Sequence, residues 1–155
     1  HAKNEYLLCI CEGNDCKSGA KGAKPGKGRI QVFQQVAEQW EHGGTIKLPK
    51  AVRYRDYVSL ALHNGSLTVL SQASSALWTG HIRSEGGEWD DLFEDDGRTY
   101  LFPRDEKGRS IYCNLEGVAW LGNGRLVVVS DKAKHEQPGR CTRKDQSIHI
   151  FTLPD

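Results

Sequence analysis

The stretch EGVAWLGNGRLVVVSD at residues 116–131 lies without a gap over YVSLALHNGSLTVLSQ at residues 57–72. A third, shortened copy, HAKNEYLLCICE at residues 1–12, fits the later part of the same pattern and places Asn4 at the turn of Asn64 and Asn123. Each copy is typical of two strands and a tight turn, because Asn-Gly favours the two positive φ angles of a two-residue hairpin. A repeat of roughly sixty residues made of strands predicts a fold assembled from repeated β units.

The segments between the copies complete each unit. Short β-branched or alternating runs, bounded by Gly, Asn or Pro, predict a third strand at residues 29–34, 77–82 and 147–153 and a fourth at residues 45–48 and 99–102. Four antiparallel strands in a meander form one blade of a β-propeller. The sequence therefore predicts an all-β fold: one partial β-propeller of about three four-stranded blades, at about residues 1–50, 51–105 and 106–155.

Two details of this prediction depend on single segments. Residues 32–40 could instead form a short helical turn, since Val36, Ala37 and Trp40 have helical spacing. Trp120 stands among apolar residues in a first strand, and we expect its indole to pack between neighbouring blades.

The first and last predicted blades are incomplete. The first copy begins at the turn and the last ends after its third strand, whereas a propeller ring closes with whole blades, usually at least four. An open arc would leave strand edges unpaired. We therefore expect a second chain, or a missing segment of a longer chain, to complete the ring.

Composition excludes several classes of protein. The chain has 155 residues, 37% of them hydrophobic, and a net charge of +1. No run approaches the ~18 consecutive apolar residues of a membrane span, so an integral membrane protein is not predicted. Single-stranded nucleic-acid binding usually adds exposed aromatic side chains to basic groups. Only Tyr54 and Tyr57 lie near the basic segments, which argues against nucleic acid as a partner.

Residues 116–131 resemble the "EG(I/V)A…(D/N)GRL(Y/V)VVS(D/E)" blade of regucalcin/gluconolactonase-like, NHL-like and esterase- or phytase-like propellers. Active members of these groups are metal-dependent hydrolases that hold a calcium-like ion in the central channel. The resemblance implies that Glu116 and Asp131 are metal ligands or a catalytic base, with Glu12 of the first copy as a further ligand. Tyr57 and Gln72 stand at the equivalent positions of the second copy and interrupt the carboxylate pattern.

The predicted blades sort the charged loops onto two faces. The loops between second and third strands share a face with the junctions between blades at residues 50–55 and 107–109, and loops on a rigid scaffold often carry function. Basic residues gather on this face: Lys17, Lys21, Lys24, Lys27, Lys132, Lys134, Arg140 and Arg143. The acidic run at residues 85–96 is expected on the opposite face. Clustered charge of one sign attracts partners of the other sign.

The charged loops also have simpler interpretations. A Gly- and Lys-rich loop is often solvated and binds nothing. Residues 15–29 contain no GxxxxGK[ST] motif, which argues against a nucleotide P-loop. The acidic run lacks the alternating ligands of a calcium-binding EF-hand, so a solvated loop is the better interpretation.

The five cysteines leave several states open. Cys9 and Cys11 lie in a strand and are expected to be small buried apolar residues. Cys16, Cys113 and Cys141 map to the basic face, where they could form one disulfide and a free thiol, bind a soft metal with His135, or do neither. The cellular compartment is not predicted.

Two hypotheses of different class follow. The first is a binding module whose basic face holds an anionic small molecule or an acidic protein surface. The second is a calcium-dependent hydrolase of lactones or phosphoesters with its site at the channel, in which the metal would activate a water molecule.

Overall fold

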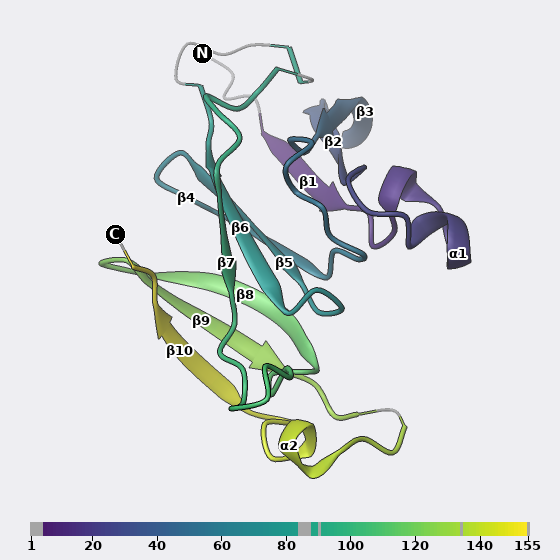
Figure 1. The fold of residues 1–155 in the computed structure, drawn as a ribbon. Coiled ribbons are helices and arrows are strands. Elements are labelled where there is room, and N and C mark those ends of the chain that lie inside the picture. Colours follow the sequence, from purple (N-terminus) through teal and green to yellow (C-terminus); the bar gives the residue numbers. More distant parts are fainter. Residues whose placement is uncertain (1–4, 84–87, 90, 134, 155) are drawn as a thin grey trace.

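A computed structural model describes residues 5–83, 88–89, 91–133 and 135–154. The described chain forms three antiparallel sheets and three short helical segments (Figure 1). The first sheet contains β1 (Tyr6–Ile10), β2 (Arg29–Val36) and β3 (Gln39–Lys47). The second contains β4 (Ser59–His63), β5 (Ser66–Ser71), β6 (Ala76–His81) and β7 (Arg98–Leu101). The third contains β8 (Leu115–Gly122), β9 (Arg125–Ser130) and β10 (Ile148–Thr152).

The strand order within each sheet follows the chain. The orders are β1-β2-β3, β4-β5-β6-β7 and β10-β9-β8, so each sheet is a meander of neighbouring strands. The prediction of an all-β chain in three antiparallel units, with the first and last one strand short, is confirmed at this level. The described residues do not close into a ring.

The tight turns form as the Asn-Gly pairs predict. Asn64 and Gly65 have φ of 47° and 72°, and Asn123 and Gly124 have φ of 51° and 66°. The alternative of a helical turn at residues 32–40 is wrong: β2 continues to Val36, and the chain reverses at Ala37, whose φ is 56°, into β3.

Strand β8 departs from the repeat. Its pairing with β9 shifts between Leu115 and Gly117 and again between Trp120 and Gly122, so Glu116 and Leu121 are extra residues. In the sequence alignment Trp120 corresponds to Ala61. In the structure Trp120 instead pairs with Leu126, as Leu62 pairs with Leu67 in the second sheet. The expectation that residues 116–131 and 57–72 match one to one therefore fails in the first strand, because bulges insert an unpaired residue.

Two hydrophobic clusters join the sheets, with the second sheet between them. On β5, Leu67 and Val69 pack toward Ile30, Val32 and Ile46 of the first sheet. Leu70 belongs to the other cluster, with residues of the third sheet such as Leu126 and Val128. Both faces of β5 are therefore buried, and its two alternating sets of side chains hold the neighbouring sheets.

The basic residues lie on two connections, one within the first sheet and one within the third. The β1–β2 connection contains η1 (Asn14–Cys16) and α1 (Gly19–Gly22), and the β9–β10 connection contains α2 (Gly139–Thr142). Figure 1 places α1 beside the first sheet and α2 beside the third, at opposite ends of the array. Within the described residues, no helix is long and apolar enough to cross a membrane.

Candidate anion-binding site

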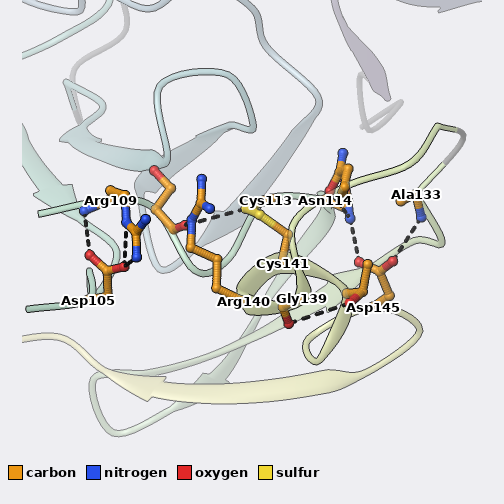
Figure 2. Close-up of a disulfide and its surroundings, with 12 residues drawn as sticks. Asp105, Arg109, Cys113, Asn114, Ala133, Gly139, Arg140, Cys141 and Asp145 are labelled. Atoms are coloured by element: carbon orange, nitrogen blue, oxygen red, sulfur yellow. Dashed lines mark hydrogen bonds and ion pairs between the residues drawn. A yellow bond between two sulfur atoms is a disulfide. The ribbon is translucent and has the colours of Figure 1, made fainter. Parts of the chain in front are cut away.

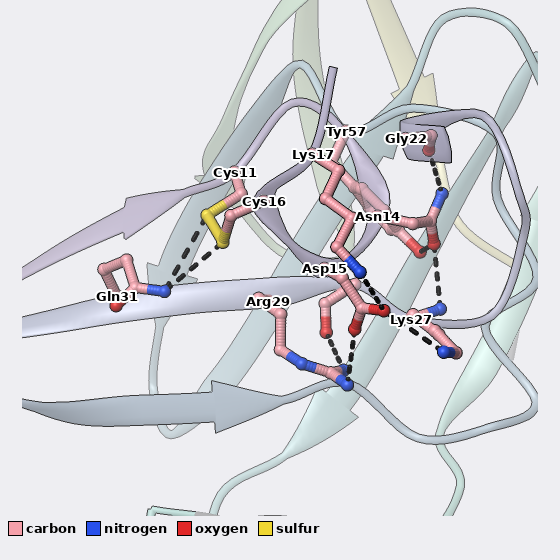
Figure 3. Close-up of polar contacts among 11 residues, drawn as sticks. Cys11, Asn14, Asp15, Cys16, Lys17, Gly22, Lys27, Arg29, Gln31 and Tyr57 are labelled. Carbon is pink, nitrogen blue, oxygen red and sulfur yellow. Dashed lines mark hydrogen bonds and ion pairs between the residues drawn. A yellow bond between two sulfur atoms is a disulfide. The ribbon is translucent and has the colours of Figure 1, made fainter. Parts of the chain in front are cut away.

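The β1–β2 connection, residues 11–28, is an ordered structure built around Asn14 (Figure 3); we call it the lysine loop. Asn14 is buried, with 1% of its surface exposed. Its Nδ2 donates to the carbonyl oxygens of Gly22 at 2.9 Å and Tyr54 at 3.1 Å. Its Oδ1 accepts the Lys27 amide at 2.8 Å and the Tyr57 hydroxyl at 3.0 Å. One amide side chain thus joins both ends of the lysine loop to the start of the second sheet.

Replacing Asn14 with Ala should lower the free energy of unfolding by about 2 to 3 kcal/mol, because it leaves buried carbonyl and N–H groups unpaired. Urea unfolding would measure the change. The exposed Lys24→Ala variant in the same loop is the control and should shift stability by less than about 0.5 kcal/mol. An Asn14→Ala protein as stable as the control would show that Asn14 does not hold the lysine loop.

Asp15 forms ion pairs with three cations, two of which, Lys17 and Lys27, belong to the lysine loop. Its carboxylate lies 3.1 Å from Lys27 Nζ, 3.0 Å from an Arg29 nitrogen and 3.8 Å from Lys17 Nζ (Figure 3). The hydrogen bond from Lys27, with the charges of Lys27, Arg29 and Lys17, holds the pKa of Asp15 below its ordinary value. Part of the predicted positive charge is thus neutralised within the chain. Lys21 and Lys24 are exposed and form no ion pair with the described residues.

A disulfide between Cys11 and Cys16 closes the start of the lysine loop. Gln31 Nε2 lies 3.3 Å from Cys16 Sγ and 3.8 Å from Cys11 Sγ. Cys9 is a free and exposed thiol. The expectation that Cys9 and Cys11 are buried apolar residues is therefore wrong, because their side chains point to the face of β1 away from the hydrophobic cluster that contains Leu8 and Ile10.

Two glycines allow the lysine loop to pack on itself. A methyl group added at Gly13 or at Gly22 would overlap the carbonyl oxygen of Lys17. The chain segments therefore meet backbone to backbone, and the loop has one compact shape that positions the lysine side chains outside.

The lysine loop borders a cavity of about 870 Å³. A methyl group added at Gly26 would lie 3.9 Å from Arg53 Cγ and 4.0 Å from the Lys50 carbonyl oxygen, so the lysine loop lies against the junction that follows β3. One wall of the cavity carries basic side chains from three places: Lys27 of the lysine loop, Arg29 and Lys47 of the first sheet, and Lys50 and Arg53 of the junction. Lys50 and Arg53 are exposed and form no ion pair with the described residues.

The other wall of the same cavity is acidic, and this corrects the predicted separation of charge. Asp91, Glu94, Asp95 and Asp96 line it together with the cations named above. The β6–β7 connection folds back beside β6, where Phe93 bridges to Ile82 and the Glu94 amide donates to the His81 carbonyl at 3.0 Å. Residues 85–87 and 90 of the acidic run lie outside the described residues.

The β9–β10 connection, residues 131–147, carries the second predicted basic cluster. Lys132 and Arg143 are exposed, Arg140 donates from Nε to the Ser110 carbonyl at 3.2 Å, and Lys134 lies outside the described residues. Asp145 accepts hydrogen bonds from Asn114 and from the Ala133 amide (Figure 2). Because α1 and α2 lie at opposite ends of the array, the two basic clusters do not form one site in the described chain.

A disulfide between Cys113 and Cys141 ties this connection to the segment before β8 (Figure 2). It is one of the states that the sequence left open. Cys16, the third cysteine predicted on the basic face, is not free, because it pairs with Cys11. His135 is exposed, and no metal-binding group forms among the described residues near it.

The three carboxylates of the predicted calcium site are all exposed: Glu12, Glu116 and Asp131. Asp131 accepts the Lys132 amide at 2.6 Å, and Glu116 occupies a bulge of β8. Among the described residues, no three His, Cys, Asp or Glu side chains are grouped to hold a metal ion. The calcium site and the catalytic roles of Glu116 and Asp131 stay predictions without support from this arrangement.

Comparison with known proteins adds no assignment. The chain matches no protein-family model. No curated protein matches it either. The resemblance of residues 116–131 to propeller blades rests on the sequence pattern alone.

The sequence indicated the lysines but not the residues that position them. Asn14, Asp15 and Tyr57 create the shape of the lysine loop, yet no periodic pattern marks a buried polar side chain in a loop. One signal was available: Asn14-Asp15 between two cysteines and glycines is a typical turn sequence, since Asn and Asp readily bond local backbone groups.

The buried Tyr57 phenol should make the free energy of unfolding fall as the pH rises above about 10. Burial raises the pKa of its phenol to about 12, against about 10 in an unfolded chain. The protonated phenol therefore contributes its full stabilisation below about pH 10, and this is lost as pH rises towards 12. Unfolding in urea at about pH 9 and pH 11 should show a loss of stability that Tyr57→Phe reduces. An equal loss of stability in both proteins would contradict the assignment to Tyr57. Burial also raises the pKa of Tyr54, which accounts for the loss that remains in the Tyr57→Phe protein.

Proposed function

We propose that this chain is a binding module that holds an anionic ligand beside the lysine loop. The observation that carries the proposal is the meeting of two chain segments at one cavity. The lysine loop is fixed by Asn14 and by the Cys11–Cys16 disulfide, and its Gly26 lies against the segment of Lys50 and Arg53. Because the backbone that carries these cations is already ordered, an anion that binds between them restricts their side chains but little of the main chain.

Hexyl phosphate is a suitable probe, because apolar residues also line the cavity, among them Leu48, Pro49 and Phe93. Isothermal titration calorimetry at low ionic strength should show binding that weakens tenfold or more in the double variant Lys50→Gln, Arg53→Gln. Added salt should weaken binding further, since exposed charges are screened beyond about 8 Å at physiological ionic strength.

The matched control is Lys132→Gln with Arg143→Gln, which removes the same charge from the other basic cluster. It should bind hexyl phosphate as the parent does. If the control loses binding and the Lys50, Arg53 variant keeps it, the anion site lies on the β9–β10 connection instead. If neither variant changes the affinity, the proposal of a basic binding face is wrong.

We further propose that the three sheets are blades of a β-propeller. The first and second sheets each pack one face on the sheet that follows, through residues such as Ile10 and Leu70. The equivalent face of the third sheet carries Val129, Ile148 and Ile150, which are 41%, 73% and 62% exposed. A further sheet, from a second chain or from a missing segment, would cover it as a following blade.

Light scattering tests the second-chain form of this proposal. Association that Ile148→Lys abolishes would support it, because a charge cannot be buried there without a partner. A chain that stays monomeric at high concentration would contradict that form and leave a missing segment as the source of the next blade.

The two disulfides favour an oxidising compartment, where such bonds form and persist. We propose that the protein works outside the reducing cytosol. Thiol titration of protein purified without reductant should find one reactive cysteine per chain, Cys9. Five reactive thiols would contradict this.

A further inference from the structure

The cavity beside the lysine loop has walls of opposite charge. Lys50 and Arg53 stand on the wall formed by the first sheet and its junction, and Glu94 and Asp96 stand on the wall formed by the β6–β7 connection. Within the described chain, neither of these cations pairs with either of these carboxylates. Opposite charges that line one cavity without meeting leave a space between them that a ligand with both charges would fit.

The backbone of the acidic wall is held by contacts with the second sheet. The Arg83 amide donates to the Leu92 carbonyl at 3.0 Å, and the Asp96 carbonyl accepts Trp78 Nε1 at 2.8 Å. Phe93 is buried against the Trp78 ring, with 5.0 Å between the ring centres. Since Trp78 is a core residue, the backbone that carries Glu94 and Asp96 is anchored to the second sheet.

The remaining carboxylates of this wall have partners of their own. Asp95 Oδ1 accepts the Gly97 amide at 2.7 Å, and Asp91 lies 3.5 Å from an Arg83 nitrogen. Glu94 and Asp96 are exposed and form no ion pair with the described residues. They are therefore the carboxylates available to an ammonium group.

We propose that the ligand of this cavity is dipolar: an anionic phosphate or carboxylate at one end, an ammonium at the other, and an apolar linker between them. The anion would lie at Lys50 and Arg53, the ammonium at Glu94 and Asp96, and the linker along Leu48, Pro49 and Phe93. The cavity, at about 870 Å³, lies in the range of small-molecule sites. This inference rests on the proposed anion site and adds the class of ligand.

The test compares alkyl phosphates with ω-aminoalkyl phosphates of the same chain length, by calorimetry at neutral pH and low ionic strength. A series of three lengths, from propyl to nonyl, covers the unknown span between the walls. We expect one length at which the amine improves affinity about tenfold, a ratio that calorimetry resolves easily. In the double variant Glu94→Gln, Asp96→Asn this improvement should disappear, while the alkyl phosphate binds at least as tightly as before.

The matched control is Glu38→Gln with Glu41→Gln, two exposed carboxylates near the β2–β3 turn. It changes net charge equally and should keep the preference for the amine. If the alkyl phosphate binds through Lys50 and Arg53 but no amine improves affinity, the dipolar ligand is wrong and the anion site stands. An equal loss of the preference in the control would also overturn the inference, because it would assign the effect to net charge. If no phosphate of the series binds, both proposals fail.

Discussion

Replacing Trp78 with Ala is expected to lower the free energy of unfolding by about 4 kcal/mol, within the range for truncating a buried aromatic residue. Trp78 is 1% exposed, and its Nε1 donates to the Asp96 carbonyl at 2.8 Å. The variant would therefore leave a large cavity, an unpaired carbonyl and a loosened β6–β7 connection. Urea unfolding gives the free energy, and Trp78→Phe should recover part of it by filling the cavity.

Trp120 is the internal comparison for this prediction. It lies between the second and third sheets, where its Nε1 donates to Thr68 Oγ1 at 3.0 Å and its ring stacks on His63. The expectation that it packs between neighbouring sheets is met, but the side chain is only partly buried. Trp120→Ala should cost about 2 kcal/mol, since part of its surface already meets water. A larger loss at Trp120 than at Trp78 would contradict the placement of the two cores.

Removing the Cys113–Cys141 disulfide with a double serine variant is expected to lower the free energy of unfolding by about 3.5 kcal/mol. The two cysteines are separated by 28 positions, and the cross-link restricts the unfolded chain by an amount that rises with the loop it closes. The same measurement, urea unfolding without reductant, applies.

The Cys11–Cys16 disulfide is the matched comparison, because it closes a separation of only 5 residues. Loop-closure entropy predicts about 2 kcal/mol for its removal. If this variant is the less stable of the two, the lysine loop depends on its disulfide for native packing, and chain entropy is not the dominant effect.

The sheets followed from the sequence because strand periodicity and Asn-Gly turns are local signals. The repeat predicted which segments pair and which of the three sheets are short of a strand. It did not predict the register with which β8 pairs with β9. The spacing of apolar residues does not show where a bulge, such as those at Glu116 and Leu121, will occur. The pairing of Cys11 with Cys16 was likewise not predictable from spacing alone.

The candidate site was predicted only in part. Lysines in a Gly-rich loop are visible in the sequence, whereas the role of Asn14 depends on carbonyl groups 8 and 40 positions away. The geometry of an idealised blade places the acidic run on the face opposite the lysines. The β6–β7 connection instead folds back along β6, since Phe93 packs on Trp78.

Backbone-amide NMR during a titration with hexyl phosphate tests most directly whether an anion binds where the lysine loop meets the junction after β3. If an anion binds there, the largest shifts should arise at Gly26, Lys27 and residues 50–53, saturate together, and diminish as salt is added. Shifts confined to residues 131–147, or no saturable shift at low ionic strength, would contradict binding there.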